Sequence, residues 1–162
     1  MRVLGIDPGY GRCGYAVVVR ERGKDTLVAA GCITTLPSDG DDRLLIVGTE
    51  LLRIITEYSP TFVAIEKIYF TKNISTGIGV AEARGVARFV TRSHKLPLIE
   101  LGPSDIKLAL TGNGNANKRS VALMVQRLLH LPLPLTPDDA SDAAAIALTG
   151  MAHHTSAFLG SL

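Results

Sequence analysis

The sequence predicts a single α/β domain built on a mixed five-stranded sheet with helices on both faces. Three observations support this fold class. The first forty residues read as consecutive strands, the later part alternates helical and strand patterns, and 162 residues of 46% hydrophobic content suffice for one core. Hairpin strands followed by right-handed crossovers give both antiparallel and parallel pairs. We expect residues 1–154 to form this domain and residues 155–162 to be a short C-terminal tail.

The N-terminal part contains the signals of three strands. Residues 3–6 are a short apolar run, and Pro8-Gly9 supplies a turn. Residues 13–20 are rich in β-branched side chains, and Gly23-Lys24 suits a hairpin turn into a third strand over residues 26–35.

The middle of the chain changes from strands to alternating helices and strands. Leucine and isoleucine recur at helical spacing from Asp42 to Tyr58, after a loop over residues 37–41. Residues 61–65 are short and continuously apolar, which predicts a buried strand that ends at Glu66. A long helix over residues 75–93 and a second buried strand over residues 97–101 follow.

Three further helices complete the expected order. Ser104 is expected to cap a short helix that ends at Leu110, and Asn117 is expected to cap a helix over residues 118–129. The last helix begins within residues 135–139 and runs through an alanine-rich stretch to about His153.

The composition limits where the protein acts. The N-terminus lacks the apolar stretch of a signal peptide, and no window is apolar enough to span a bilayer, so we expect a soluble cytoplasmic protein with no membrane partner. Cys13 and Cys32 have neither metal-ligand spacing nor the density of a disulfide framework, which favours buried or half-buried thiols.

Charge is distributed unevenly along the chain. Residues 67–127 contain ten basic and three acidic residues, whereas the rest of the chain contains seven basic and twelve acidic residues. A basic middle beside acidic ends suits a polyanion that lies against a metal-loaded carboxylate site. A well-solvated surface would explain the same run of charge.

Four acidic residues lie where a strand ends or a helix begins, namely Asp7, Glu66, Asp139 and Asp142. Ligands bind at the carboxyl ends of strands in open α/β sheets, and two acids three residues apart share one face of a helix. Carboxylate oxygens without cysteine or suitably spaced histidine favour Mg²⁺ or Mn²⁺ over zinc. Two such ions about 4 Å apart can hydrolyse a phosphodiester without a protein nucleophile.

Each acid also has a structural explanation. Asp7 precedes Pro8-Gly9, so its role could be limited to forming a turn. Asp139 could belong to a capping box with Thr136 as the cap. Asp142 could face solvent. Glu66 is harder to explain in this way, because an acid directly after a buried run needs a partner.

Several segments together resemble one family. They are GIDPG with Asp7, AIEKIYFTKN with Glu66, EARGVA, the stretch from Lys107 to Lys118, and DDASDAAAIA with Asp139 and Asp142. In this order, over about residues 3–153, they resemble the RuvC family of Holliday junction resolvases. The resemblance implies an RNase H-like fold and a homodimer that resolves four-way DNA junctions by paired symmetric nicks with Mg²⁺ or Mn²⁺.

The resemblance also assigns roles to residues. It implies that Asp7, Glu66, Asp139 and Asp142 are catalytic metal ligands, for two ions per site, and that Lys107 and Lys118 lie near the scissile phosphate. The family usually has Phe where this chain has Tyr69, so either Tyr69 or Phe70 could be the ring that stacks at the crossover, or could pack in the core. Lys72, Arg84 and Arg119 are further candidates for DNA contacts.

The same resemblance suggests partners, and several alternative functions stay open. The helix over residues 75–93 resembles the family's dimer interface and contains small residues that permit close helix contact, although these would also serve internal packing. A branch-migration complex of the RuvA and RuvB type is an expected partner. The alternatives are a nucleotide-binding ATPase, which a single short domain disfavours, a non-catalytic junction-binding protein, and an RNase H-like nuclease that acts on structured RNA.

Overall fold

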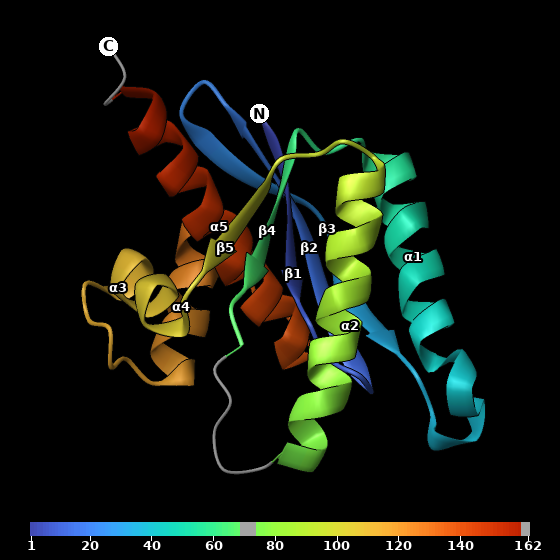
Figure 1. Cartoon of the computed structure of the whole chain (residues 1–162). Helices are drawn as coiled ribbons and strands as arrows, with labels where there is room; N and C mark the ends of the chain where they lie inside the picture. Colours follow the sequence, from blue (N-terminus) through green and yellow to red (C-terminus); the bar gives the residue numbers. More distant parts are fainter. Residues whose placement is uncertain (69–73, 160–162) are drawn as a thin grey trace.

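The computed structural model describes residues 1–68 and 74–159. Its centre is a five-stranded sheet with the strand order β3-β2-β1-β4-β5 (Figure 1). The strands are β1 (Arg2–Asp7), β2 (Arg12–Glu21), β3 (Lys24–Thr34), β4 (Phe62–Glu66) and β5 (Leu98–Leu101). The predicted mixed sheet is confirmed, because β1, β2 and β3 pair antiparallel whereas β1, β4 and β5 pair parallel.

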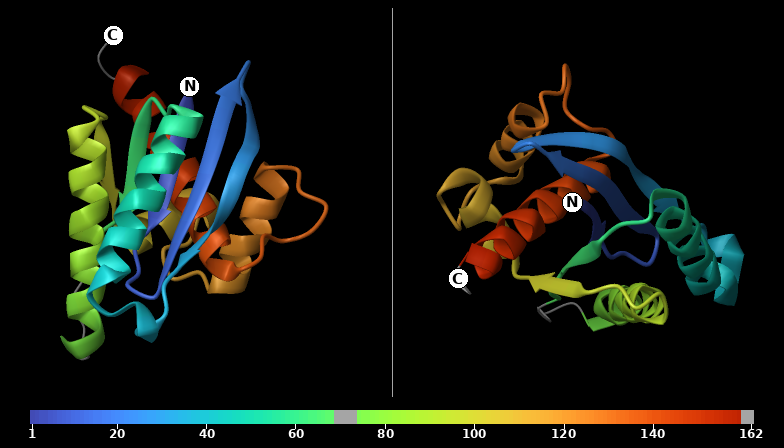
Figure 2. Two further views of the ribbon diagram at one scale, coloured as in Figure 1. Left: turned by 90° about the vertical axis from the view of Figure 1, so that its right-hand side faces the viewer. Right: turned by 90° about the horizontal axis from the view of Figure 1, so that it is seen from above.

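Helices cover both faces of the sheet, as the sequence predicted. A short 3-10 helix η1 (Pro37–Asp42) precedes α1 (Arg43–Tyr58), which lies with α2 (Ile74–Ser93) on one face. The opposite face carries α3 (Pro103–Thr111), α4 (Lys118–Leu128) and α5 (Asp138–Leu159) (Figure 2). Each face has its own apolar core, one around Ile54 and Ile65 and the other around Phe62 and Ile146.

Local sequence rules explain most of the element boundaries. The carboxamide of Asn117 accepts a hydrogen bond from the Ser120 N–H at 2.9 Å, so the predicted cap of α4 is confirmed. The β2–β3 hairpin turns at Arg22-Gly23, both at positive φ, one residue earlier than predicted. Cys13 is buried and Cys32 half-buried, and both are free thiols.

Three helix boundaries differ from the prediction. Gly102, and not Ser104, precedes α3, because Pro103 supplies a preset first helical residue and the Asp105 carboxylate accepts the Gly102 N–H at 3.2 Å. Residues 37–42 form η1 instead of a plain loop. The last helix, α5, continues to Leu159 and so includes much of the expected tail, because no Gly or Pro interrupts the sequence between Gly150 and Gly160.

No helix within residues 1–68 and 74–159 has both the length and the apolar character that crossing a membrane requires.

Candidate active site

Asp7 and Glu66 end two neighbouring parallel strands and point to the same face of the sheet. In β1, Val3 packs in the core beneath α5, whereas Leu4 packs in the core beneath α1. The same alternation holds in β4, and the register pairs Ile6 with Ile65. Since side chains alternate between faces along a strand, both carboxylates point towards α5.

Two glycines allow α5 to pack directly on the strands. A Cβ atom at Gly5 would lie 2.1 Å from the Ala143 carbonyl oxygen, and one at Gly14 would lie 2.2 Å from the Asp139 carbonyl oxygen. No larger residue fits at either position while the helix keeps its place. This close contact sets the first turns of α5 beside the ends of β1 and β4.

A cavity of about 310 Å³ lies between these strand ends and the helices α3, α4 and α5. Asp7, Glu66 and Asp142 line it together with Lys107 and Lys118. Apolar side chains of the three helices complete its wall. The structure therefore brings three of the four predicted acids and two predicted lysines into one cavity.

The carboxylates of this cavity repel one another. The pKa of Asp7 is raised to about 7, first by burial and then by the charges of Glu66, Asp142 and Asp139. Burial also raises the pKa of Glu66 and of Asp142, although Lys118 opposes both shifts. The cavity thus favours an added cation.

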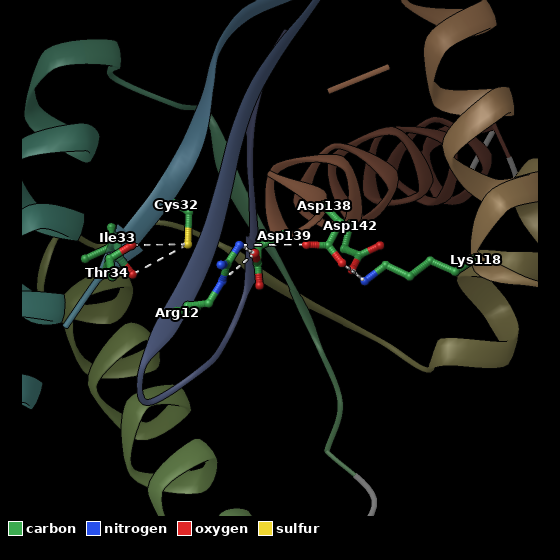
Figure 3. Close-up of polar contacts among 8 residues, drawn as sticks. All are labelled: Arg12, Cys32, Ile33, Thr34, Lys118, Asp138, Asp139 and Asp142. Atoms are coloured by element: carbon green, nitrogen blue, oxygen red, sulfur yellow. Dashed lines mark hydrogen bonds and ion pairs between the residues drawn. The ribbon is translucent and has the colours of Figure 1, made fainter. Parts of the chain in front are cut away.

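Lys118 supplies part of the missing positive charge. Its Nζ lies 2.7 Å from an oxygen of Asp142 and 2.8 Å from an oxygen of Asp138 (Figure 3). These contacts raise the pKa of Lys118. The side chain is at the first residue of α4, where free backbone N–H groups also favour an anion.

Asp139 does not line the cavity, although its charge contributes to the raised pKa of Asp7. Its carboxylate accepts hydrogen bonds from Arg12, with 2.9 Å between Nε and the carboxylate oxygen (Figure 3). Arg12 also lies 3.7 Å from Asp138. Since α5 begins at Asp138 and the Asp139 carboxylate bonds Arg12, the cap role considered for Asp139 does not describe this side chain.

The acids do not form a ready metal cage in this conformation. In the part of the chain that the structure describes, no three histidine, cysteine or acidic side chains are arranged to hold a metal ion. Arg12 and Lys118 instead form ion pairs with Asp139 and Asp142. The donor set nevertheless fits Mg²⁺ or Mn²⁺, since it offers only carboxylate oxygens in a cavity with excess negative charge. A divalent ion would compete with the two cationic side chains for the same oxygens.

The remaining predicted DNA-binding residues have different surroundings. Lys107 is half-buried in the cavity, and Arg119 is exposed on α4. Arg84 is largely buried and bonds the backbone of Glu66 and the side chain of Glu100. The predictions for Tyr69, Phe70 and Lys72 fall outside the described residues.

Sequence reasoning missed Arg12 and the two glycines beneath α5. Nothing in the sequence pairs Arg12 with Asp139, because 127 positions separate them. Gly5 and Gly14 did leave a signal, since glycine inside a strand pattern often marks a close backbone approach.

Comparison with known proteins identifies the family. Residues 3–150 match the family model of the crossover junction endodeoxyribonuclease RuvC. This chain belongs to the RuvC family. The crossover junction endodeoxyribonuclease RuvC of Synechococcus sp. (strain CC9902) is 43% identical over 152 residues, which cover 93% of this chain and 97% of the relative.

Solved structures of the RuvC family share the fold. The Thermus thermophilus RuvC structure matches with a TM-score of 0.89 at 30% identity, and the match covers 97% of each chain. The structure of T. thermophilus RuvC in complex with a Holliday junction substrate matches with a TM-score of 0.86 at 33% identity, over 92% of each chain. The predicted RNase H-like fold class is confirmed, and so is the predicted family with its endodeoxyribonuclease activity.

Proposed function

We propose that this RuvC protein resolves four-way DNA junctions by paired symmetric nicks. The observation that carries the proposal is the cavity in which Asp7, Glu66 and Asp142 face Lys107 and Lys118. Acids that attract divalent ions and lysines that attract phosphate are the two parts that metal-dependent phosphodiester hydrolysis requires. The similarity to T. thermophilus RuvC, solved with a Holliday junction substrate, supports a four-way junction as the nucleic acid.

Each side chain has a distinct part in this proposal. Asp7, Glu66, Asp139 and Asp142 would hold Mg²⁺ or Mn²⁺, with two ions per site. When bound, the ions activate a water and stabilise the charge of the phosphate. Lys107 and Lys118 would hold the phosphate by charge. Lys118 is paired with Asp138 and Asp142 in the absence of DNA and metal. No protein nucleophile is needed.

The test uses a synthetic four-way junction with Asp7→Asn. Wild-type protein in Mg²⁺ or Mn²⁺ is expected to give symmetric nicks with ligatable ends. The variant is expected to lose cleavage at least about a hundredfold, because a metal ligand is gone. It should bind the junction as tightly as wild type or more tightly, because one negative charge near the phosphate is removed.

The matched control is Asp41→Asn, which changes an exposed acid in η1. It should cut and bind like wild type. Absence of cleavage by wild-type protein in both metals would contradict the proposed function. Loss of binding by Asp7→Asn in a gel-shift assay would contradict the separation of binding from catalysis.

We further propose a homodimer that forms through α2. Ile78 and Phe89 are 53% and 73% exposed on this helix, and Gly85 lies between them on the same stripe with open space beside it. Next to Phe89, an apolar groove between α1 and α2 includes Leu45 and Leu52. A second copy of the chain is the expected occupant, because two-fold symmetry would present two active sites to the pseudo-symmetric arms of a junction. Association with a branch-migration complex stays a prediction of the family resemblance.

A further inference from the structure

Arg84 connects α2 to the strand that carries Glu66. Its Nε donates a hydrogen bond to the Glu66 carbonyl oxygen at 3.1 Å, and its Nη2 donates to the Glu100 carboxylate in β5. The Arg84 side chain is only 17% exposed, and that of Glu100 is 28% exposed. Two nitrogens of the guanidinium therefore donate hydrogen bonds within the protein instead of facing solvent.

The Glu66 carbonyl needs a donor from outside the sheet. The Lys67 N–H bonds the Leu101 carbonyl of β5 at 2.8 Å, so the backbone groups of the preceding residue, Glu66, point towards β1. Continuing the β1–β4 register sets Glu66 opposite Asp7, and the next donor along the chain would be residue 8. This residue is Pro8, which has no N–H. Arg84 satisfies the acceptor that Pro8 leaves without a ladder partner.

This hydrogen bond is made to Glu66, the same residue whose carboxylate belongs to the proposed active site. The Glu66 carboxylate lines the active-site cavity while its own carbonyl is bound by Arg84. Fixing the peptide plane that follows Glu66 restricts the direction of its Cα–Cβ bond. Small displacements of a reacting group lower rates strongly, so such a restriction affects catalysis without any contact with substrate.

Arg88 provides a natural comparison on the same helix. Its Nη2 lies 3.3 Å from the other Glu100 oxygen, and its side chain is 48% exposed. Both arginines carry one positive charge and pair with Glu100, but the hydrogen bond to the Glu66 carbonyl comes from Arg84.

We propose that Arg84 is a positioning residue, which holds the Glu66 carbonyl and so aims the Glu66 carboxylate at the site that Asp7 and Asp142 share. This role replaces the direct DNA contact that the sequence suggested for Arg84. The inference rests on the proposed junction cleavage.

The test compares Arg84→Ala, Arg84→Lys and Arg88→Ala. Single-turnover cleavage with saturating protein should slow about 10- to 100-fold in Arg84→Ala, whereas the junction Kd and its dependence on salt should stay within about twofold of wild type. Arg84→Lys should recover part of the rate, because its ammonium can donate to either the carbonyl or Glu100 but not span both. Arg88→Ala should stay within about twofold of wild type in rate, because Glu66 keeps its bond.

A second readout does not depend on cleavage. Calorimetric titration of Mn²⁺ without DNA should show weaker binding in Arg84→Ala than in Arg88→Ala, by about tenfold. If Arg84→Ala fails to fold by circular dichroism, Glu100→Gln replaces it, because it weakens the hold on the guanidinium while keeping the shape of the side chain. Slower cleavage at unchanged junction affinity is expected for Glu100→Gln as well.

The outcomes separate the inference from the proposed function. A higher Kd with a shallower salt dependence and an unchanged saturated rate would make Arg84 a phosphate ligand and overturn the inference. Equal rates and equal Mn²⁺ affinities in Arg84→Ala and Arg88→Ala would overturn it too. A wild-type protein that never cuts would refute the proposed function, and the Mn²⁺ titration would still decide the role of Arg84.

Discussion

Asp7 stands at the end of β1 with Glu66, Asp142 and Asp139 around it, and both burial and these charges raise its pKa to about 7. In an unfolded chain an aspartate has a pKa of about 3.9. Between these two values the folded protein binds more protons than the unfolded chain, so stability falls as the pH rises from about 4 to about 7. Above pH 7 the folded state carries the full cost of the ionised Asp7.

We therefore expect Asp7→Asn to stabilise the metal-free protein at pH 8. The gain in the free energy of unfolding should be about 1–3 kcal/mol, and it should become small near pH 4, where Asp7 is protonated in the folded state and about half protonated in the unfolded chain. Urea unfolding in the presence of EDTA at the two pH values measures it, with Asp41→Asn as the control. Adding Mn²⁺ should stabilise wild type more than the variant. A variant less stable than wild type at pH 8 without metal would show that Asp7 has a favourable partner in the metal-free protein.

Arg12 offsets part of the negative charge of the acids at the start of α5. It bonds Asp139 outside the cavity and lies near Asp138, while Lys118 bonds Asp138 and Asp142 from the other side (Figure 3). Both cations are more than half exposed, with 53% and 59% of the side chain accessible. Exposed ion pairs are weak, so these contacts hold the acids in place without preventing a divalent ion from displacing them.

The packing of α5 on the sheet decides where its two acids lie. Gly14 pairs with Asp7 across the β1–β2 ladder, and the Asp139 carbonyl occupies the space that a side chain on Gly14 would need. The N-terminal turn of α5 therefore depends on a missing methyl group beside Asp7. This contact links the stability of the fold to the geometry of the site.

Gly14→Ala should consequently damage both properties. The added Cβ must push the helix start away from β2, so we expect a loss of about 1–3 kcal/mol in unfolding free energy and slower junction cleavage at unchanged binding. Thermal melts and single-turnover assays measure the two effects. Gly114→Ala is the control, because a Cβ there would lie 3.5 Å from its nearest neighbour, the Ser104 carbonyl oxygen. An unchanged melting temperature in Gly14→Ala would mean that α5 shifts without cost.

The small residues of α2 have two separate uses. Gly79 packs against the Tyr10 ring, since a Cβ there would lie 2.8 Å from it, and Ala83 and Ala87 are buried in the domain. A Cβ atom at Gly85 would meet open space beyond its own turn of the helix, and Gly85 lies on the same exposed stripe as Phe89. Gly79, Ala83 and Ala87 therefore serve packing within the domain, whereas Gly85 leaves room for a neighbouring helix.

Phe89→Asp should therefore produce a monomer without unfolding the domain. A charge at the centre of an apolar contact costs several kcal/mol of association, which is enough to dissociate a dimer at micromolar concentration. Light scattering after size-exclusion chromatography measures the mass. Leu133→Asp is the matched control, because Leu133 is 74% exposed and lies outside α2. A dimer that persists in Phe89→Asp and separates in Leu133→Asp would move the interface away from α2.

At the scale of the whole molecule, much of the fold follows from apolar residues that recur every 2 residues in strands and about every 3.6 residues in helices. The order of strands and helices was predictable, and so was the meeting of Asp7 and Glu66, because each follows an apolar strand of known alternation. Helical spacing put Asp142 on one face with Asp139, but only the family resemblance favoured Asp142 as a site residue over a solvent-facing one. The pairing of Asp139 with Arg12 was not predictable, because it depends on how far α5 slides along β2, which the contacts at Gly5 and Gly14 determine. The burial of Arg84 depends likewise on the docking of α2 against β4 and β5.

The proposed dimer, with two active sites, predicts a specific behaviour of mixed dimers. A heterodimer of wild-type and Asp7→Asn subunits keeps both halves of the junction surface but has one intact set of acids. On a supercoiled plasmid with an extruded cruciform, the wild-type homodimer should make two symmetric cuts and yield linear DNA. The heterodimer should make one cut, which relaxes the plasmid, and so yield open circles.

Differently tagged subunits allow the heterodimer to be purified, and agarose gels resolve the three plasmid forms. The Asp7→Asn homodimer is the control and should leave the plasmid supercoiled. A single nick releases the torsional stress that keeps the cruciform extruded, so linear product requires two cuts within the lifetime of one complex. Linear DNA from the heterodimer, with subunit exchange excluded by the tags, would mean that one site cuts both strands in turn. The symmetric pair of sites proposed from the α2 stripe would then be unnecessary.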